Sequence, residues 1–279
     1  MQPHTLETLA AQAREIRKYT IQTIATLGIG HLGGSLSLVE LMTLLYYHEM
    51  DIRPEDPTWE DRDKFILSKG HAGPVLYATL ATRGYFPLEW LETLNQGGTN
   101  LPSHCDRNRT PGIDMSTGSL GQGLSVACGM AYANRLDNRG SWVYAVIGDG
   151  ETDEGQNWEA AMFAAHQKLN RIIAFTDFNR LQIDGFTEQV LSLGDIEGKW
   201  NTFGWYVQRC DGHNFNDISH AIGRVKAQAE QQGGKPSMII LDTIKGKGAR
   251  FAEGKVANHN MPVDAQTARE AIAQLYGEK

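Results

Sequence analysis

The sequence predicts an α/β fold with a mainly parallel sheet that carries helices on both faces. Three observations predict it: short apolar runs alternate with helical patterns, these runs are apolar throughout, and loops rich in glycine, histidine and aspartate follow them. Continuous apolar runs are typical of parallel strands that are covered on both faces. Ligands bind such sheets beyond the carboxyl ends of the strands, so we expect the functional residues in those loops.

The order of the elements follows from hydrophobic periodicity. Apolar runs predict strands over residues 65–67, 142–147, 171–176, 205–209 and 238–242. Helical spacing predicts helices over residues 6–27, 121–135, 155–169 and 217–231, and a C-terminal tail helix over about 264–277. Ser37-Leu38-Val39-Glu40 has the pattern of a capping box and should open a further helix that ends near Tyr47. No linker or repeat divides residues 1–279, so we expect a single domain.

Composition excludes several classes of function. The chain of 279 residues has a formal net charge of −7 and a pI of about 5.7, which argues against a general nucleic-acid surface. The longest apolar stretch, residues 36–47, is too short to span a bilayer, and residues 5–18 lack the apolar core of a signal peptide. The three cysteines are widely spaced and odd in number, which suits a reducing compartment. We expect a cytoplasmic protein with no nucleic-acid or membrane partner.

Gly148-Asp149-Gly150 ends one predicted strand, and Asn179 follows the end of the next. A carboxylate and an amide carbonyl are hard oxygen ligands that suit Mg²⁺ or Ca²⁺. The glycines would let a diphosphate approach the backbone closely, with a helix N-terminus beyond. A tight turn with Asp and Asn as turn formers is the alternative interpretation of the first motif.

Taken together, Gly148-Asp149-Gly150 and Phe178-Asn179 resemble the signature of thiamine-diphosphate enzymes. The resemblance implies the thiamine-diphosphate-binding fold and makes the chain its diphosphate-binding domain. It also implies that Asp149, Asn179 and the backbone carbonyl of Leu181 hold Mg²⁺, for which Ca²⁺ or Mn²⁺ could substitute.

The histidine-containing loops resemble those of the transketolase family, in the same order along residues 10 to 262. The matching segments are Gly30-His31-Leu32-Gly33-Gly34-Ser35, Leu67-Ser68-Lys69-Gly70-His71-Ala72, Leu101-Pro102-Ser103-His104, Gly118-Ser119-Leu120-Gly121-Gln122-Gly123, and Thr243-Ile244-Lys245-Gly246-Lys247-Gly248 followed by His259. Three positions depart from the family pattern. Leu32 and Cys105 stand where proline is usual, and Asn260 stands where glycine is commoner.

The resemblance assigns a role to each histidine, the side chain best suited to moving protons at neutral pH. His31 and His259 would contact the cofactor diphosphate and the reacting hydroxyls, and His71 and His104 would contact the sugar. These four are the expected catalytic residues. The expected cofactor-binding residues are His31, His71, Gly118, Ser119, Leu120, Gly148, Asp149, Gly150, Glu154, Asn179, Ile183, Lys245 and His259, with Leu120 and Ile183 packing on the thiazolium ring.

The chain stops where familiar transketolases continue into a second half that supplies the aminopyrimidine pocket and an activating glutamate. The resemblance therefore implies the N-terminal subunit of a split transketolase, inactive without a C-terminal subunit. It would transfer a two-carbon ketol unit from a ketose phosphate to an aldose. The small-residue helix 121–133 and the acidic turn Asp153-Glu154 resemble the family's subunit contacts, with Glu154 as a buried interface carboxylate; this implies a homodimeric core within a heterotetramer.

Two other functions remain open from the sequence. The α-subunit of a 2-oxo-acid dehydrogenase shares the metal motif and the split architecture, although the histidine loops argue against it. A cofactor-binding subunit without turnover is the second alternative, against which His31, His71 and His104 weigh. The sequence does not identify the ketose donor or the aldose acceptor.

Overall fold

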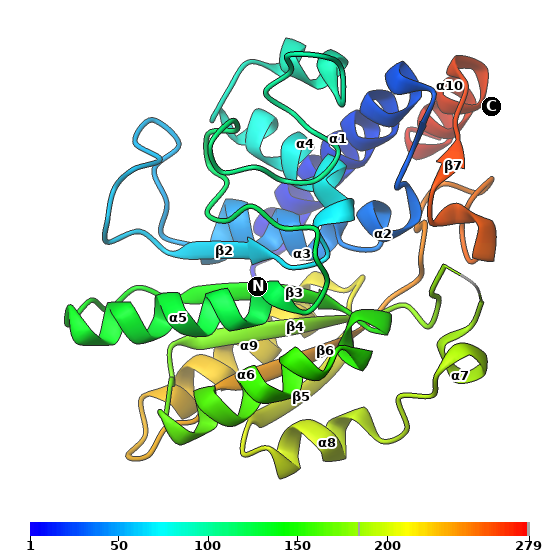
Figure 1. Cartoon of the computed structure of the whole chain (residues 1–279). Helices are drawn as coiled ribbons and strands as arrows, with labels where there is room; N and C mark the ends of the chain where they lie inside the picture. Colours follow the sequence, from blue (N-terminus) through cyan, green and yellow to red (C-terminus); the bar gives the residue numbers. More distant parts are fainter. Residues whose placement is uncertain (184, 278–279) are drawn as a thin grey trace.

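A computed structural model of the chain describes residues 1–183 and 185–277 (Figure 1). Its main sheet has five parallel strands in the order β2-β3-β4-β6-β5. The strands are β2 (Lys64–Leu67), β3 (Val143–Gly148), β4 (Ile172–Phe178), β5 (Tyr206–Asp211) and β6 (Ser237–Asp242). Each lies where an apolar run predicted a strand, which confirms the parallel α/β prediction.

The helices cover both faces of this sheet, as Figure 1 shows. They are α1 (Pro3–Leu27), α2 (Gly33–Leu36), α3 (Val39–Leu44), α4 (Gly73–Arg83), α5 (Gln122–Leu136), α6 (Gly155–His166), α7 (Thr187–Val190), α8 (Ile196–Thr202), α9 (Phe215–Ala229) and α10 (Ala265–Leu275). A two-stranded antiparallel sheet joins β1 (Ile29–Gly30) to β7 (Met261–Pro262). The sequence patterns did not predict α2, α4, α7, α8 or this small sheet.

Strand β3 shows why continuous apolar runs were needed. Tyr144 and Val146 belong to the apolar core beneath α1, α3, α4 and α9, whereas Val143, Ala145 and Ile147 belong to the core beneath α5 and α6. Successive strand residues point to opposite faces, so a strand that separates two cores must be apolar at every position. Within residues 1–183 and 185–277, no helix is long and apolar enough to cross a membrane.

The prediction of a capping box at Ser37 and Glu40 is wrong. Helix α3 begins at Val39 without any side-chain cap, and it gives way at Leu45 to a π-helical turn that ends at Glu49. The Ser37 hydroxyl instead donates to the carboxylate of Asp177, at 2.7 Å. The hydroxyl thus donates a charge-assisted hydrogen bond to a buried carboxylate far along the sequence and does not accept from a local backbone N–H, as a capping box requires.

Candidate functional site

The predicted site residues meet at the carboxyl edge of the main sheet. Strands β3 and β4 pair in register up to Gly148 and Asp177, so the loops that carry Asp149 and Asn179 leave the sheet side by side. A cavity of about 300 Å³ lies beyond these strand ends. Residues after β2, β3, β4 and β6 line it, together with Gly34 of α2 and Leu120 just before α5. The full set is Gly34, Lys69, His71, Leu120, Gly148, Asp149, Gly150, Glu151, Asp153, Glu154, Asn179, Leu181, Gln182, Ile183, Lys245 and His259.

The four predicted histidines form one cluster, although they are spread over more than 220 residues of sequence. The ring centroid of His31 lies 5.3 Å from that of His71, 5.7 Å from that of His104 and 5.4 Å from that of His259. The His71 and His259 centroids are 4.8 Å apart. The sequence placed these residues on separate loops, and the fold brings all four rings together.

Burial keeps three rings of this cluster, those of His31, His71 and His259, neutral. Burial, then the neighbouring His104 and Lys245, lowers the pKa of His31. Burial and nearby cations also lower the pKa of His71 well below its usual range, and burial together with Lys245 lowers the pKa of His259 to about 3. Neutral imidazoles can both accept and donate protons, so the cluster has the chemistry needed to contact hydroxyl groups.

His104 is the exposed member of the cluster and packs against Gly118. Gly118 has a φ of +145°, and a Cβ placed there would lie 2.9 Å from His104 Cδ2. Both the backbone conformation and the close approach therefore require glycine. The neighbouring Ser119 is exposed and does not line the cavity, so its predicted contact with a cofactor stays a prediction.

The predicted oxygen donors suit a hard cation. Burial and the nearby Asp177 raise the pKa of Asp149 to about 7, so a cation beside this carboxylate would stabilise its charged form. Within the described residues, Asn179 Oδ1 accepts only the Leu181 N–H, at 3.1 Å. The Leu181 carbonyl accepts a hydrogen bond from the Lys245 ammonium at 3.0 Å, so a cationic group already contacts one of the three donors. This donor set fits Mg²⁺.

No group of three or more His, Cys, Asp or Glu side chains that could hold a metal occurs in the described parts of the chain, residues 1–183 and 185–277. The predicted metal site has only one carboxylate, together with an amide oxygen and a backbone carbonyl, so it does not belong to this class of site.

Lys245 is almost fully buried, with 3% of its surface exposed. Its ammonium lies 3.2 Å from His259 Nδ1, in addition to its contact with the Leu181 carbonyl. Burial and the neighbouring Lys69 lower the pKa of Lys245 to about 8. A buried cation that contacts only neutral groups is costly unless an anion approaches it, so Lys245 is well placed to face a diphosphate.

The sequence interpretation missed the buried ion pair between Lys69 and Asp177. Lys69 Nζ lies 2.5 Å from Asp177 Oδ2, and Asp177 also accepts hydrogen bonds from Ser37, Asn179 and Thr243. Although burial opposes ionisation, Lys69 lowers the pKa of Asp177. Lys69 belongs to a loop that was singled out, whereas Asp177 is the next-to-last residue of β4. An ionisable side chain directly after an apolar run was the available signal.

Two glutamates after β3 differ from expectation. Glu151 is buried, and its carboxylate accepts hydrogen bonds from Ser68 Oγ, from Gly121 N at 2.8 Å and from Gly148 N at 2.9 Å. It joins three of the loops, and no sequence pattern assigned it a role. Glu154 lines the cavity but is exposed, so its burial at a subunit interface stays a prediction.

An apolar rim borders the cavity. Leu120 is 37% exposed and Ile183 is 65% exposed, and both line the opening. Exposed apolar side chains at the mouth of a polar cavity are typical of a site that covers part of a ligand or of a partner.

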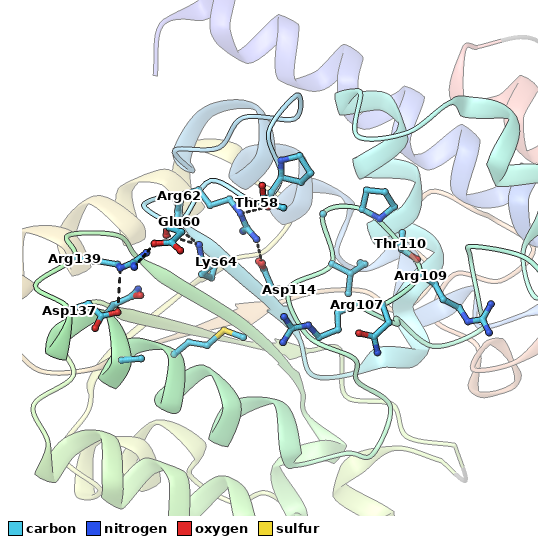
Figure 2. A pocket seen from close by; sticks show the side chains of 18 residues that line it. Thr58, Glu60, Arg62, Lys64, Arg107, Arg109, Thr110, Asp114, Asp137 and Arg139 are labelled. Carbon is cyan, nitrogen blue, oxygen red and sulfur yellow. Dashed lines mark hydrogen bonds and ion pairs between the residues drawn. The ribbon is translucent and has the colours of Figure 1, made fainter.

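A larger cavity, of about 750 Å³, shares no lining residue with the one at Asp149 (Figure 2). Figure 2 shows that its charged side chains mostly face one another: Arg62 pairs with Asp114, and Arg139 pairs with Glu60 at 2.6 Å and Asp137 at 3.4 Å. These pairs neutralise much of the charge within the cavity itself. Size alone therefore does not make it the better candidate.

Comparison with known families gives a match over residues 8–278, to the family described as transketolase, thiamine diphosphate binding domain. The chain is 55% identical over 270 residues to a 6-deoxy-6-sulfo-D-fructose transketolase subunit of Clostridium sp. strain MSTE9, covering 97% of both chains. It is 37% identical to an apulose-4-phosphate transketolase subunit of Actinobacillus succinogenes, covering 100% of both chains.

Longer relatives match over part of their length. The chain is 35% identical to human transketolase, with 98% of this chain matching 43% of that protein. The crystal structure of transketolase from Campylobacter jejuni superimposes with a TM-score of 0.90 at 30% identity, over 100% of this chain and 44% of that one. The likeness therefore covers the whole of this chain but less than half of these longer proteins.

Proposed function

We propose a function on the premise that this chain belongs to the transketolase family, through the thiamine diphosphate binding domain that its sequence matches. It is the cofactor-binding subunit of a split transketolase and transfers a two-carbon ketol unit from a ketose to an aldose. The observation that carries the proposal is the cluster of four histidines beside Asp149 and Asn179.

Asp149, Asn179 and the Leu181 carbonyl would hold Mg²⁺, and the Mg²⁺ would bind the diphosphate of thiamine diphosphate. Lys245 supplies a buried positive charge on the same side of the cavity. Leu120 and Ile183 would cover the apolar ring of the cofactor. When bound, thiamine diphosphate supplies the electron sink for carbon–carbon cleavage.

The histidines would handle the protons of the sugar. Cleavage of a polyhydroxylated ketose requires that hydroxyl protons be removed and returned at neutral pH. His71 and His104 would hold the carbonyl and hydroxyl ends of the substrate, and His31 and His259 would serve the hydroxyls nearest the cofactor. Their low pKa values leave His31, His71 and His259 neutral, so each can accept a proton.

A separate C-terminal subunit would complete the site, since two whole-length relatives are named as subunits. The pair of helices α5 and α6 presents exposed apolar side chains, among them Leu136 at 64%, Met162 at 54% and Phe163 at 42%. Such a surface favours association. We therefore propose that α5 and α6 form the contact of a homodimeric core, which becomes a heterotetramer with the partner subunit.

The sulfonated ketose is the best-supported donor. The relative that is 55% identical is named for 6-deoxy-6-sulfo-D-fructose, whereas the relative named for apulose 4-phosphate is 37% identical. We propose a 6-deoxy-6-sulfo-ketohexose as the donor, in preference to the ketose phosphate that the resemblance alone implied.

Complementation tests this proposal. The purified chain, with Mg²⁺ and thiamine diphosphate, should show no ketol transfer by itself. Addition of the C-terminal subunit from the same source should start transfer from 6-deoxy-6-sulfo-D-fructose with a higher kcat/KM than from fructose 6-phosphate. Activity of the isolated chain would contradict the split site, and a preference for the phosphate would contradict the proposed donor.

A further inference from the structure

The loop that follows β6 carries Lys245 and is anchored at one end by His213. The Ile244 N–H donates a hydrogen bond to His213 Nε2, at 2.9 Å. On the other side of the ring, His213 Nδ1 lies 2.9 Å from Glu40 Oε2. A backbone N–H can only donate, so Nε2 must be the acceptor and Nδ1 must carry the proton. His213 is thus a neutral ring that links the loop to a carboxylate.

The other end of the same loop is anchored by Arg17. Arg17 Nε donates to the Lys247 carbonyl at 3.0 Å, and Arg17 Nη2 donates to Glu40 Oε1 at 2.7 Å. The side chain crosses the loop at Gly248, where φ is +84° and a Cβ would lie 2.7 Å from Arg17 Cδ. Only glycine allows this crossing. The two oxygens of Glu40 therefore bind His213 and Arg17, two of the side chains that anchor the loop.

This network is largely shielded from solvent. The side chains of Arg17, Glu40 and His213 are 8%, 11% and 13% exposed. Although burial opposes ionisation, Arg17 and His213 lower the pKa of Glu40, so the carboxylate stays charged. Charge-assisted hydrogen bonds in a buried setting fix geometry more firmly than exposed ones do.

None of Arg17, Glu40 and His213 lines the cavity at Asp149, and two of them, His213 and Arg17, contact the loop that carries Lys245 into it. The loop carries the Lys245 ammonium to the Leu181 carbonyl and to His259. We infer that His213, with Glu40 behind it, is a positioning residue that sets Lys245 for the diphosphate. This inference rests on the function proposed above and extends it to residues that touch neither cofactor nor substrate.

Hydrogen exchange tests the anchor without any cofactor. His213→Asn keeps an amide near Glu40, but its side chain is too short to accept a hydrogen bond from Ile244 N. His213→Gln has a longer side chain, whose amide nitrogen and oxygen are separated by about the distance between the two imidazole nitrogens, so it can replace both hydrogen bonds. Loss of one hydrogen bond of about 1 kcal/mol should speed exchange in a peptide covering residues 243–248 by about fivefold in His213→Asn. The Gln variant should stay near the wild type, and so should the exposed control His220→Asn.

Cofactor titration then tests the consequence. With Mg²⁺ present, His213→Asn should weaken thiamine diphosphate binding by about fivefold. In the complemented enzyme at saturating cofactor, kcat should change less than this. His213→Gln should restore the affinity. Unchanged exchange in residues 243–248, or equal acceleration along the whole chain, would overturn the positioning role. Faster exchange with unchanged affinity would overturn the link to the cofactor. If the wild-type chain bound no thiamine diphosphate, the proposed function would fail, whereas the exchange data would still decide the anchor.

Discussion

The two edges of the main sheet carry charge in opposite ways. At the carboxyl edge, Lys69, Asp149, Glu151, Asp177 and Lys245 are all buried, and among these five only Lys69 and Asp177 form an ion pair. At the amino edge, around the cavity in Figure 2, Arg62 and Arg139 are paired with carboxylates, and Arg107 and Arg109 are exposed to solvent.

The difference shows which edge is built for a ligand. Burying a charge without a partner costs several kcal/mol, and proteins accept that cost mainly where a ligand or a reaction needs it. Partly exposed pairs cost little and contribute little. The amino edge also buries Asp63 and Asp114, but four buried ionisable side chains, Lys69, Asp149, Glu151 and Lys245, line a single cavity at the carboxyl edge. This concentration of buried charge, rather than cavity size, identifies the carboxyl edge as the functional one.

The largest expected effect comes from breaking the buried pair. Lys69→Met leaves the carboxylate of Asp177 buried without its cation, which should lower the free energy of unfolding by about 3–5 kcal/mol. Urea unfolding at pH 7 measures this. A loss below about 1 kcal/mol would mean that the carboxyl edge tolerates charge as easily as the amino edge does.

The second effect is on the ligand. Asp149→Ala should weaken Mg²⁺-dependent thiamine diphosphate binding by at least about 100-fold, equivalent to about 2.7 kcal/mol, because it removes the charged metal ligand. Calorimetric titration with and without Mg²⁺ measures it. The control at the amino edge, Asp137→Ala, should bind the cofactor as the wild type does; equal losses in both variants would remove the contrast between the edges.

The third expected effect is a loss of stability at low pH, caused by the partly buried His71 at the carboxyl edge. The pKa of His71 is lowered by burial, so below its ordinary value of about 6.5 the unfolded chain binds a proton that the folded chain refuses. The lowered pKa of His71 therefore costs no stability above pH 6.5. Below that pH, the free energy of unfolding falls by up to about 1.4 kcal/mol per pH unit, until the pH reaches the pKa of His71 in the folded protein.

His71→Gln should therefore flatten the fall in stability between pH 6.5 and 5. Urea unfolding at several pH values measures the slope. The exposed control His220→Gln should keep the wild-type slope. A slope that His71→Gln leaves unchanged would show that this ring is protonated in the folded protein.

The smallest effect is expected at the amino edge. Arg139→Met removes a side chain that is 25% exposed from pairs whose carboxylates are 58% to 76% exposed. Screening by solvent should leave the free energy of unfolding nearly unchanged. A loss comparable to that of Lys69→Met, in the same urea experiment, would place a buried charge network at both edges.

Local sequence patterns were sufficient for the strands and for the loops that end them. Continuous apolar runs located all five strands of the main sheet, because a strand between two cores must be apolar on both faces. Asp149, Asn179 and His71 could be placed at one edge because each follows a predicted strand and the carboxyl ends of parallel strands share that edge. His31, His104 and His259 were assigned to the site by the resemblance of their loops.

The pairings across that edge were decided only by the tertiary structure. Ser37 reaches Asp177 across 140 residues, and His213 reaches Glu40 across 173. A sequence motif such as the capping box indicates only which hydrogen bonds are possible between residues close in sequence. The donors that bind a buried carboxylate are instead those that the tertiary structure places beside it. Ser37 and Glu40 were therefore misread as partners in a helix cap: Ser37 supports the Lys69–Asp177 pair, and Glu40 holds the loop of Lys245, because burial makes those long-range contacts the stronger ones.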